Sequence, residues 1–157
     1  MDMKNAKIVL VEDDQILSKV LREELEDAGF SVTQAFDGEQ GVETVQSVMP
    51  DLVLLDIMMP KMNGFEALRV LRASPATETI PVIILTMLGK DEDVKQGLQL
   101  GAKDYIVKSQ HAVAEITEKV KDFFKMEAHP RQHELKREVK EPEEQEEEKI
   151  PREKTRD

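Results

Sequence analysis

The stretch DLVLLDIMMPKMNG, residues 51–64, decides the fold prediction for this chain. Four apolar residues, Leu52 to Leu55, lead directly into the carboxylate of Asp56, and a loop with proline and glycine follows. A continuous apolar run of this length is typical of a strand that is buried on both faces of a sheet. A carboxylate, however, is costly to bury. The question is whether Asp56 only begins the loop or is held at this position for chemistry.

Composition limits the class of protein. The chain has 157 residues, of which 39% are hydrophobic and 35% charged, and its formal net charge is −11. This charge disfavours direct binding to nucleic acid. The chain has no cysteine, which excludes disulfides and thiolate metal sites. No apolar run approaches the roughly 20 residues that span a bilayer, and MDMKNAK, at the N-terminus, lacks the apolar core of a signal peptide. We expect a soluble, cytoplasmic protein without membrane insertion.

The last part of the chain differs in composition from the rest. From Glu127 onward the sequence is almost entirely polar and charged, and EPEEQEEEK at 141–149 is low in complexity. Such a segment cannot bury enough apolar surface to offset the entropy lost on ordering. We therefore predict one domain over residues 1–126 and a charged, disordered tail over residues 127–157.

Residues 1–126 alternate between strand and helix patterns. Short apolar runs predict strands at 7–11, 30–36, 52–55, 80–86 and 104–108. Helical spacing predicts helices at 14–28, near 42–48, 65–72, 94–100 and 111–126. The side chains expected on inner faces are Ile16, Leu17, Val20, Leu21, Leu25 and Ala28 in the first helix, Val94, Leu98 and Leu100 in the fourth, and Val113, Ile116, Val120, Phe123 and Phe124 in the last.

Five strand–helix units predict an α/β fold with a doubly wound, five-stranded parallel sheet and helices on both faces. We expect the flavodoxin-like strand order 2-1-3-4-5. In such sheets ligands bind beyond the carboxyl ends of the strands, at the point where the strand order reverses. That point lies between the first and third strands.

Polar residues stand at four of these strand ends. The first strand is followed by Glu12, Asp13 and Asp14, the third by Asp56, the fourth ends in Thr86 and the fifth in Lys108. Carboxylates brought together in one crevice repel each other and require a cation. Oxygen ligands without a nearby histidine or cysteine favour Mg²⁺ over a transition metal.

This set of residues also suggests a reaction. A carboxylate such as Asp56 can act as a nucleophile and accept a phosphoryl group as an aspartyl phosphate. Phosphoryl transfer depends on in-line positioning and on cations around the phosphoryl oxygens. Lys108 offers a second cation, and the Thr86 hydroxyl offers a hydrogen bond. We therefore interpret Asp56 as a residue that is phosphorylated.

Over residues 7 to about 125 the chain resembles the receiver domain of two-component response regulators. The motifs that carry the resemblance are VEDD at 11–14, DLVLLDIMMPKMNG at 51–64, IILT at 83–86 and GAKDYIVK at 101–108. The resemblance implies that Asp56 is the phosphoacceptor. It implies that Asp13 binds Mg²⁺ directly, that Glu12 binds it mostly through water, and that Asp56 and the Met58 backbone carbonyl are further ligands. It also implies that Thr86 and Tyr105 are the two residues that change position when the family's domains switch. Lys108 corresponds to the lysine that the family carries at this strand end.

The resemblance further implies partners. A histidine kinase or phosphotransfer protein would donate the phosphoryl group, and a downstream protein would bind the face formed by the fourth helix, fifth strand and fifth helix. The chain looks like a stand-alone, chemotaxis-type regulator, a signalling switch without a turnover substrate. One departure is Ser109, which stands where the family usually has a cis proline after its lysine. A cis bond before a non-proline residue costs about 2.5–4 kcal/mol, so we expect a trans or a visibly strained peptide bond here.

Other interpretations compete with this one. Asp13 or Asp14 alone could be a helix N-cap, and the cluster of Met58, Met59 and Met62 is typical of loop packing. A Mg²⁺-dependent phosphohydrolase of the haloacid-dehalogenase type would also use Asp56 as its nucleophile, but it needs a second aspartate two residues later, where this chain has Met58. A nucleotide-binding module would need a glycine-rich loop in place of the acids after the first strand.

Overall fold

The computed structural model describes residues 5–127, and the predicted tail lies outside them apart from Glu127. The strands are β1 (Lys7–Val11), β2 (Ser31–Ala35), β3 (Leu52–Leu55), β4 (Val82–Thr86) and β5 (Asp104–Val107). The helices are α1 (Gln15–Asp27), α2 (Gly38–Val48), α3 (Gly64–Ala73), α4 (Asp91–Gln99) and α5 (Val113–Glu127), and a 3₁₀ turn, η1, spans Lys108–Gln110. Within residues 5–127 no helix is both long and apolar enough to cross a bilayer.

The five strands form one parallel sheet in the predicted order, β2-β1-β3-β4-β5. The central strands β1, β3 and β4 are almost completely buried, as their unbroken apolar runs predict. The edge strand β2 alternates between exposed and half-buried residues until Ala35. The doubly wound, flavodoxin-like architecture is therefore confirmed.

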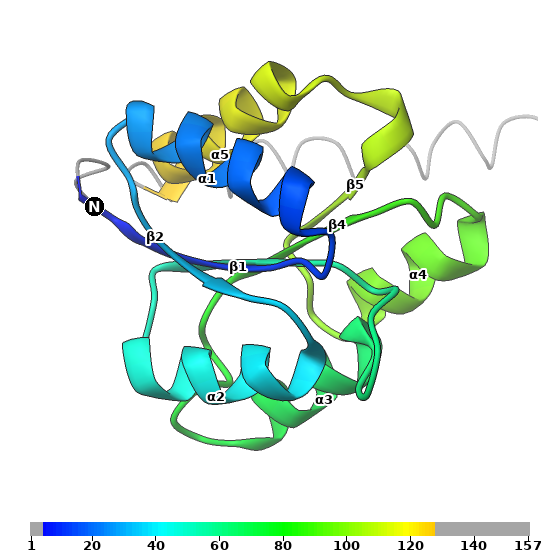
Figure 1. Cartoon of the computed structure of the whole chain (residues 1–157). Coiled ribbons are helices and arrows are strands. Elements are labelled where there is room, and N and C mark those ends of the chain that lie inside the picture. The colour runs from blue at the N-terminus through cyan, green and yellow to red at the C-terminus, as the bar shows by residue number, and fades with distance from the viewer. Residues whose placement is uncertain (1–4, 128–157) are drawn as a thin grey trace, which may run out of the picture.

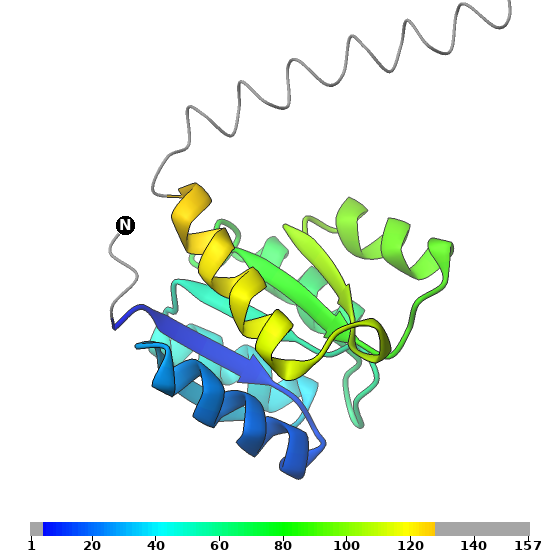
Figure 2. The ribbon, with the colours of Figure 1, turned by 90° about the horizontal axis from the view of Figure 1, so that it is seen from above.

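Helices cover both faces of the sheet, as Figure 1 shows. On one face α1 and α5 lie side by side, above the sheet in Figure 1 and in front of it in Figure 2. Their buried side chains, among them Leu21, Leu25, Val120 and Phe124, share a core with the buried residues of β1 and β3 that face these helices. On the other face α2 and α3 pack on a second core that includes Val45, Leu68 and Leu71.

The predicted inner face of α1 is wrong at two positions. Ile16 is 80% exposed and Val20 is 41% exposed, whereas Leu21 and Leu25 are buried. Ser18 takes a buried place instead, and its hydroxyl accepts a hydrogen bond of 2.8 Å from Gln34 Nε2 on β2. The apolar stripe of the sequence is therefore broader than the strip of helix that contacts the sheet, and the hydrogen bond from Gln34 allows Ser18 to occupy a buried position in that strip.

The predicted inner face of α4 is wrong at Leu98, whereas Leu100, just after the helix, packs against the core as predicted. Leu98 is 47% exposed, and Gly97 is the buried residue of this helix. A Cβ atom at Gly97 would lie 2.6 Å from Ile84 Cδ1 and 3.0 Å from Tyr105 Cδ2. The missing side chain therefore lets α4 approach the sheet closely, which turns Leu98 outward.

Candidate functional site

The sheet brings the predicted acidic residues together. Val11 of β1 pairs in register with Leu55 of β3, so the next residues, Glu12 and Asp56, leave neighbouring strands at the same level. The Asp56 amide donates to the Val11 carbonyl at 3.0 Å, which extends the hydrogen-bond ladder between β1 and β3 to Asp56 itself. Carboxylate oxygens of Glu12, Asp13 and Asp56 lie within 4.8 Å of one another.

The three acids differ in exposure. Glu12 is 1% exposed and Asp56 is 5% exposed, whereas Asp13 is open to solvent. Asp14, the fourth acid of this region, caps α1, since its Oδ1 accepts hydrogen bonds from the amides of Ile16 and Leu17. The N-cap reading is thus confirmed for Asp14, and Asp13 belongs to the acidic cluster.

Lys108 lies between the two buried carboxylates. Its Nζ is 2.5 Å from Glu12 Oε1 and 2.9 Å from Asp56 Oδ2. The lysine follows β5 directly, at the start of η1 rather than within the predicted strand 104–108. No peptide bond of the described residues is cis, so the bond to Ser109 is trans, one of the two alternatives expected there. Lys108 reaches Asp56 without the proline.

The charges of this cluster perturb each other. Burial raises the pKa of Glu12 to about 7, and the neighbouring Asp56 charge adds to the rise, against the hydrogen bond from Lys108. Burial alone would lower the pKa of Lys108, but its hydrogen bonds to Glu12 and Asp56 more than offset burial and raise it. Lys108 is therefore a permanent cation beside a carboxylate that protonates easily.

Thr86 and Tyr105 meet at Leu88, in the loop that follows β4. Thr86 is fully buried, and its Oγ1 accepts a hydrogen bond of 3.4 Å from the Leu88 amide. The Tyr105 hydroxyl donates to the Leu88 carbonyl at 2.7 Å. Burial, together with the charges of Asp93 and Asp56, raises the pKa of this hydroxyl to about 12. Sequence reasoning missed Leu88 because it takes part through backbone atoms, which leave no signal in the side-chain pattern.

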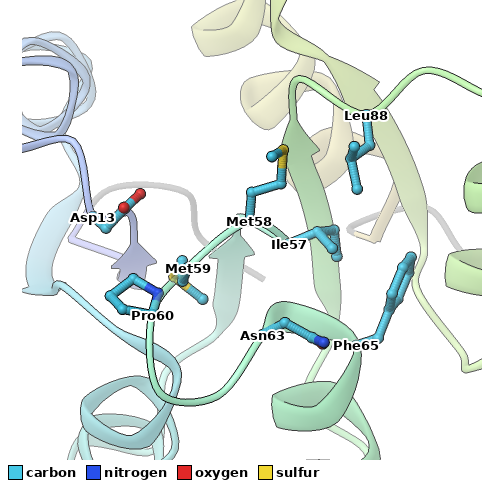
Figure 3. A pocket seen from close by; sticks show the side chains of 8 residues that line it. All are labelled: Asp13, Ile57, Met58, Met59, Pro60, Asn63, Phe65 and Leu88. Carbon is cyan, nitrogen blue, oxygen red and sulfur yellow. The ribbon is translucent and has the colours of Figure 1, made fainter.

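A hollow of about 620 Å³ borders the acidic cluster. Figure 3 shows Asp13 on one side of it, Leu88 and Phe65 on the other, and the loop from Ile57 to Asn63 between them. The predicted packing role of the methionines holds for Met59 and Met62, which pack on the core. It is wrong for Met58, whose side chain lines the hollow and is 56% exposed.

The donor atoms of the cluster fit a hard divalent cation. All are oxygens, and Glu12 Oε1 is buried with no hydrogen-bond donor other than the Lys108 ammonium as ion-pair partner. Glu12 and Asp56 are buried whereas Asp13 faces solvent, so an ion bound here would be reached by water. This suits Mg²⁺, which usually keeps several of its waters. The residues present therefore fit the predicted ion.

Comparison with known proteins decides the family. The sequence pattern of the response regulator receiver domain matches residues 8–121. The chain belongs to this family. It is a receiver domain of the kind found in two-component systems, and the haloacid-dehalogenase alternative is not favoured.

Relatives and solved structures agree with this assignment. The chain is 48% identical over 102 residues to the transcriptional regulatory protein CpxR of Escherichia coli, covering 65% of this chain and 42% of CpxR. A receiver domain of Francisella response regulator 1452 superposes with a TM-score of 0.71 at 30% identity, covering 77% of this chain and 98% of that one. The Mn²⁺-bound form of response regulator Rcp1 gives 0.68 at 26%, covering 76% and 94%. The chain spans less than half the length of the curated relatives it matches.

Proposed function

We propose that Asp56 accepts a phosphoryl group from a phosphohistidine of a histidine kinase or phosphotransfer protein, in a Mg²⁺-dependent reaction. The observation that carries the proposal is the position of the Asp56 carboxylate, 2.9 Å from the Lys108 ammonium and within the cluster of Glu12 and Asp13. On both sides of this buried acid there is a place for a cation, the Lys108 ammonium and the ion site. These cations would stabilise the oxygens of a phosphoryl group on Asp56.

The roles of the other residues follow from their places. Asp13, Asp56 and the Met58 carbonyl would hold Mg²⁺, with Glu12 acting mostly through water. The bound ion would supply charge neutralisation for the phosphoryl oxygens. The Mn²⁺ ion of Rcp1, a relative of the same fold, supports a divalent cation here.

The transfer is a substitution at phosphorus. A carboxylate oxygen of Asp56 forms the new O–P bond while the P–N bond of the phosphohistidine breaks. The leaving imidazole nitrogen keeps the electron pair of that bond and takes a proton from solvent. Lys108, held by Glu12 in the resting protein, is placed to bind a phosphoryl oxygen as the charge moves away from Asp56. Water later hydrolyses the acyl phosphate, so the domain resets and has no turnover substrate.

Phosphorylation becomes a signal through Thr86, Leu88 and Tyr105. A phosphoryl group brings roughly two negative charges and strong acceptor oxygens, and the Thr86 hydroxyl gains a hydrogen bond by moving toward it. That movement disturbs the Leu88 backbone, which Tyr105 holds. The ring then follows, and the face of α4, β5 and α5 changes for a downstream protein. We place this switch in the cytoplasm, without direct contact to nucleic acid or insertion into a membrane.

The proposal is tested with acetyl phosphate and Mg²⁺ as a small phosphodonor. We expect the intact protein to gain the mass of one phosphoryl group, and Asp56→Asn to gain none. The matched control is Asp51→Asn, which removes a carboxylate at the opposite end of β3 and leaves the gain intact. Phosphorylation of Asp56→Asn at the wild-type stoichiometry would refute the acceptor assignment.

A further inference from the structure

The side chain of Met58 has no part in the proposed function, which uses only the backbone carbonyl of this residue. Its thioether is 56% exposed and lines the hollow beside the acidic cluster, together with Leu88 and Phe65 (Figure 3). The Met58 amide also donates to Asp56 Oδ1 at 3.3 Å, so the residue lies directly beside the acceptor. A chemical change of this side chain therefore changes the surroundings of Asp56.

Methionine supplies every sulfur atom of this protein. The chain has eight methionines and no cysteine, so no thiol competes for an oxidant. Oxidants such as hydrogen peroxide convert a thioether into a sulfoxide, and they reach exposed side chains first. Within residues 5–127 the most exposed methionines are Met58 and Met87, at 56% and 58%. Met59 and Met62 are only partly exposed and pack on the core, so peroxide should reach Met58 well before them.

The side chains around the hollow offer few partners to a water molecule. Most of them are apolar, and only Asp13 and Asn63 have polar side chains. A water is held in place where several polar groups bind it, and a thioether sulfur is a weak acceptor. A water beside the reduced Met58 side chain is therefore poorly fixed for attack on a group at Asp56.

We propose that Met58 is an oxidation site and that its sulfoxide shortens the lifetime of phosphorylated Asp56. In the oxidation a sulfur lone pair attacks one oxygen of hydrogen peroxide, so that an S–O bond forms while the O–O bond breaks. The hydroxide that leaves takes the proton of the transferred hydroxyl group and becomes water. The sulfur loses two electrons and the peroxide gains them. The lifetime part of this inference rests on the proposed function, in which Asp56 carries the phosphoryl group.

The sulfoxide changes what the hollow holds. Its oxygen is a polar acceptor on a side chain of the same length, and it binds a water beside the acyl phosphate and orients it for attack. The water oxygen bonds to phosphorus, the bond from phosphorus to Asp56 breaks, and the carboxylate keeps the electron pair while a water proton goes to solvent. We expect the lifetime to fall at least about threefold, the effect of one added hydrogen bond on the barrier.

Two substitutions at position 58 separate the sulfur from the rest of the side chain. Met58→Leu keeps an apolar side chain that peroxide does not oxidise, and Met58→Gln supplies a polar acceptor without any oxidant. The matched control is Met126→Leu, which removes a thioether that is 43% exposed near the end of α5. The neighbouring Glu127 lines a different hollow, with Asp51 at the opposite end of β3 from Asp56.

Each protein is divided in two, and one half receives a limited treatment with hydrogen peroxide. Both halves are phosphorylated with acetyl phosphate and Mg²⁺ and freed of the donor, and the loss of the phosphoryl group is followed by intact mass. Fragment spectra of the peptide that holds both Met58 and Met59 locate the sulfoxide. We expect it at Met58, with Met59 still reduced.

Peroxide should shorten the phosphorylated lifetime of wild type and of Met126→Leu by the same factor. It should not change the lifetime of Met58→Leu, whatever the starting value of that variant. Without peroxide, Met58→Gln should lose its phosphoryl group faster than Met58→Leu. Methionine sulfoxide reductases for both sulfoxide epimers should restore the lifetime of oxidised wild type.

Three results would overturn the inference. Met58 could stay reduced while Met126 is oxidised, oxidised Met58 could leave the lifetime unchanged, or peroxide could shorten the lifetime of Met58→Leu as much as that of wild type. The last result would assign the effect to another methionine, such as Met87. Failure of reduced wild type to be phosphorylated would instead refute the proposed function and the lifetime effect with it, while the fragment spectra would still decide whether Met58 is the oxidation site.

Discussion

At the scale of single residues, Asp56 shows how a charge is held at the end of a buried strand. Its carboxylate is compensated by Lys108, which also pairs with Glu12. Removing one partner of a buried ion pair leaves an uncompensated charge, which is costlier than the pair itself contributes. The site therefore depends on one lysine when no divalent cation is bound.

Lys108→Met should expose this dependence. We expect it to lower the free energy of unfolding in EDTA by about 2–4 kcal/mol, because two adjacent carboxylates lose their cation. Added Mg²⁺ should recover part of this loss. The control is Lys121→Met, which breaks an exposed pair with Glu118 and should cost less than about 1 kcal/mol. Urea denaturation measures both, and equal losses in the two variants would contradict the account.

Glu12 gives a second prediction at this scale, on pH. The pKa of Glu12 is about 7 in the folded protein and near 4.5 when unfolded. Between these values the folded state binds more protons than the unfolded state, so the contribution of Glu12 to stability falls as pH rises. In EDTA, we expect the wild-type free energy of unfolding to drop by at most about 3 kcal/mol from pH 5 to pH 7.5. Glu12→Gln should flatten this slope, and an unchanged slope would show that other groups cause it.

At the scale of elements, hydrogen bonds at the backbone of Leu88 join the end of β4 to β5. Thr86 ends β4 and Tyr105 lies in β5. The Leu88 amide donates to the Thr86 hydroxyl, and the Leu88 carbonyl accepts from the Tyr105 hydroxyl. The Tyr105 ring also contacts α4 where Gly97 brings the helix close. A shift of Thr86 therefore has a short physical path to the tyrosine and the helix.

The chain offers a built-in reporter of this path, since it contains one tyrosine and no tryptophan. Beryllofluoride with Mg²⁺, which mimics the phosphoryl group, should change the tyrosine fluorescence of the wild-type protein. Thr86→Ala should bind the mimic and show a much smaller change, whereas Thr79→Ala, an exposed threonine before β4, should behave as wild type. Full occupancy of Asp56 with an unchanged Tyr105 signal would refute the switching account.

At the scale of the whole molecule, the parallel sheet and the composition of its site were predictable from sequence for two reasons. Continuous apolar runs identify buried strands, and parallel strands bring their carboxyl ends to one edge, so Asp13, Asp56 and Lys108 converge. Details that depend on tertiary contact were not predictable. Ile16 is apolar but exposed, whereas Ser18 is polar but buried with Gln34 as its partner, and the contact of Gly38 with Met62 joins residues distant in sequence.

The tail gives a prediction at this scale. Apolar cores pack on both faces of the sheet within residues 5–127, so we expect residues 127–157 to be dispensable for folding and for phosphorylation. A chain truncated after Met126 should melt within about 3 °C of the full chain. Such a shift corresponds to a change of about 1 kcal/mol or less in the free energy of unfolding, as expected if the tail adds little to stability. Loss of the cooperative thermal transition would place the domain boundary elsewhere.

The central claim, that Asp56 receives the phosphoryl group, is tested most directly by locating the modification. The full chain is treated with acetyl phosphate and Mg²⁺, reduced with borohydride, which converts an acyl phosphate into an alcohol, and digested for peptide mass mapping. We predict that position 56 becomes homoserine and that Asp13 and Glu12 remain unmodified. Reduction at any other carboxylate, with Asp56 intact, would contradict the account.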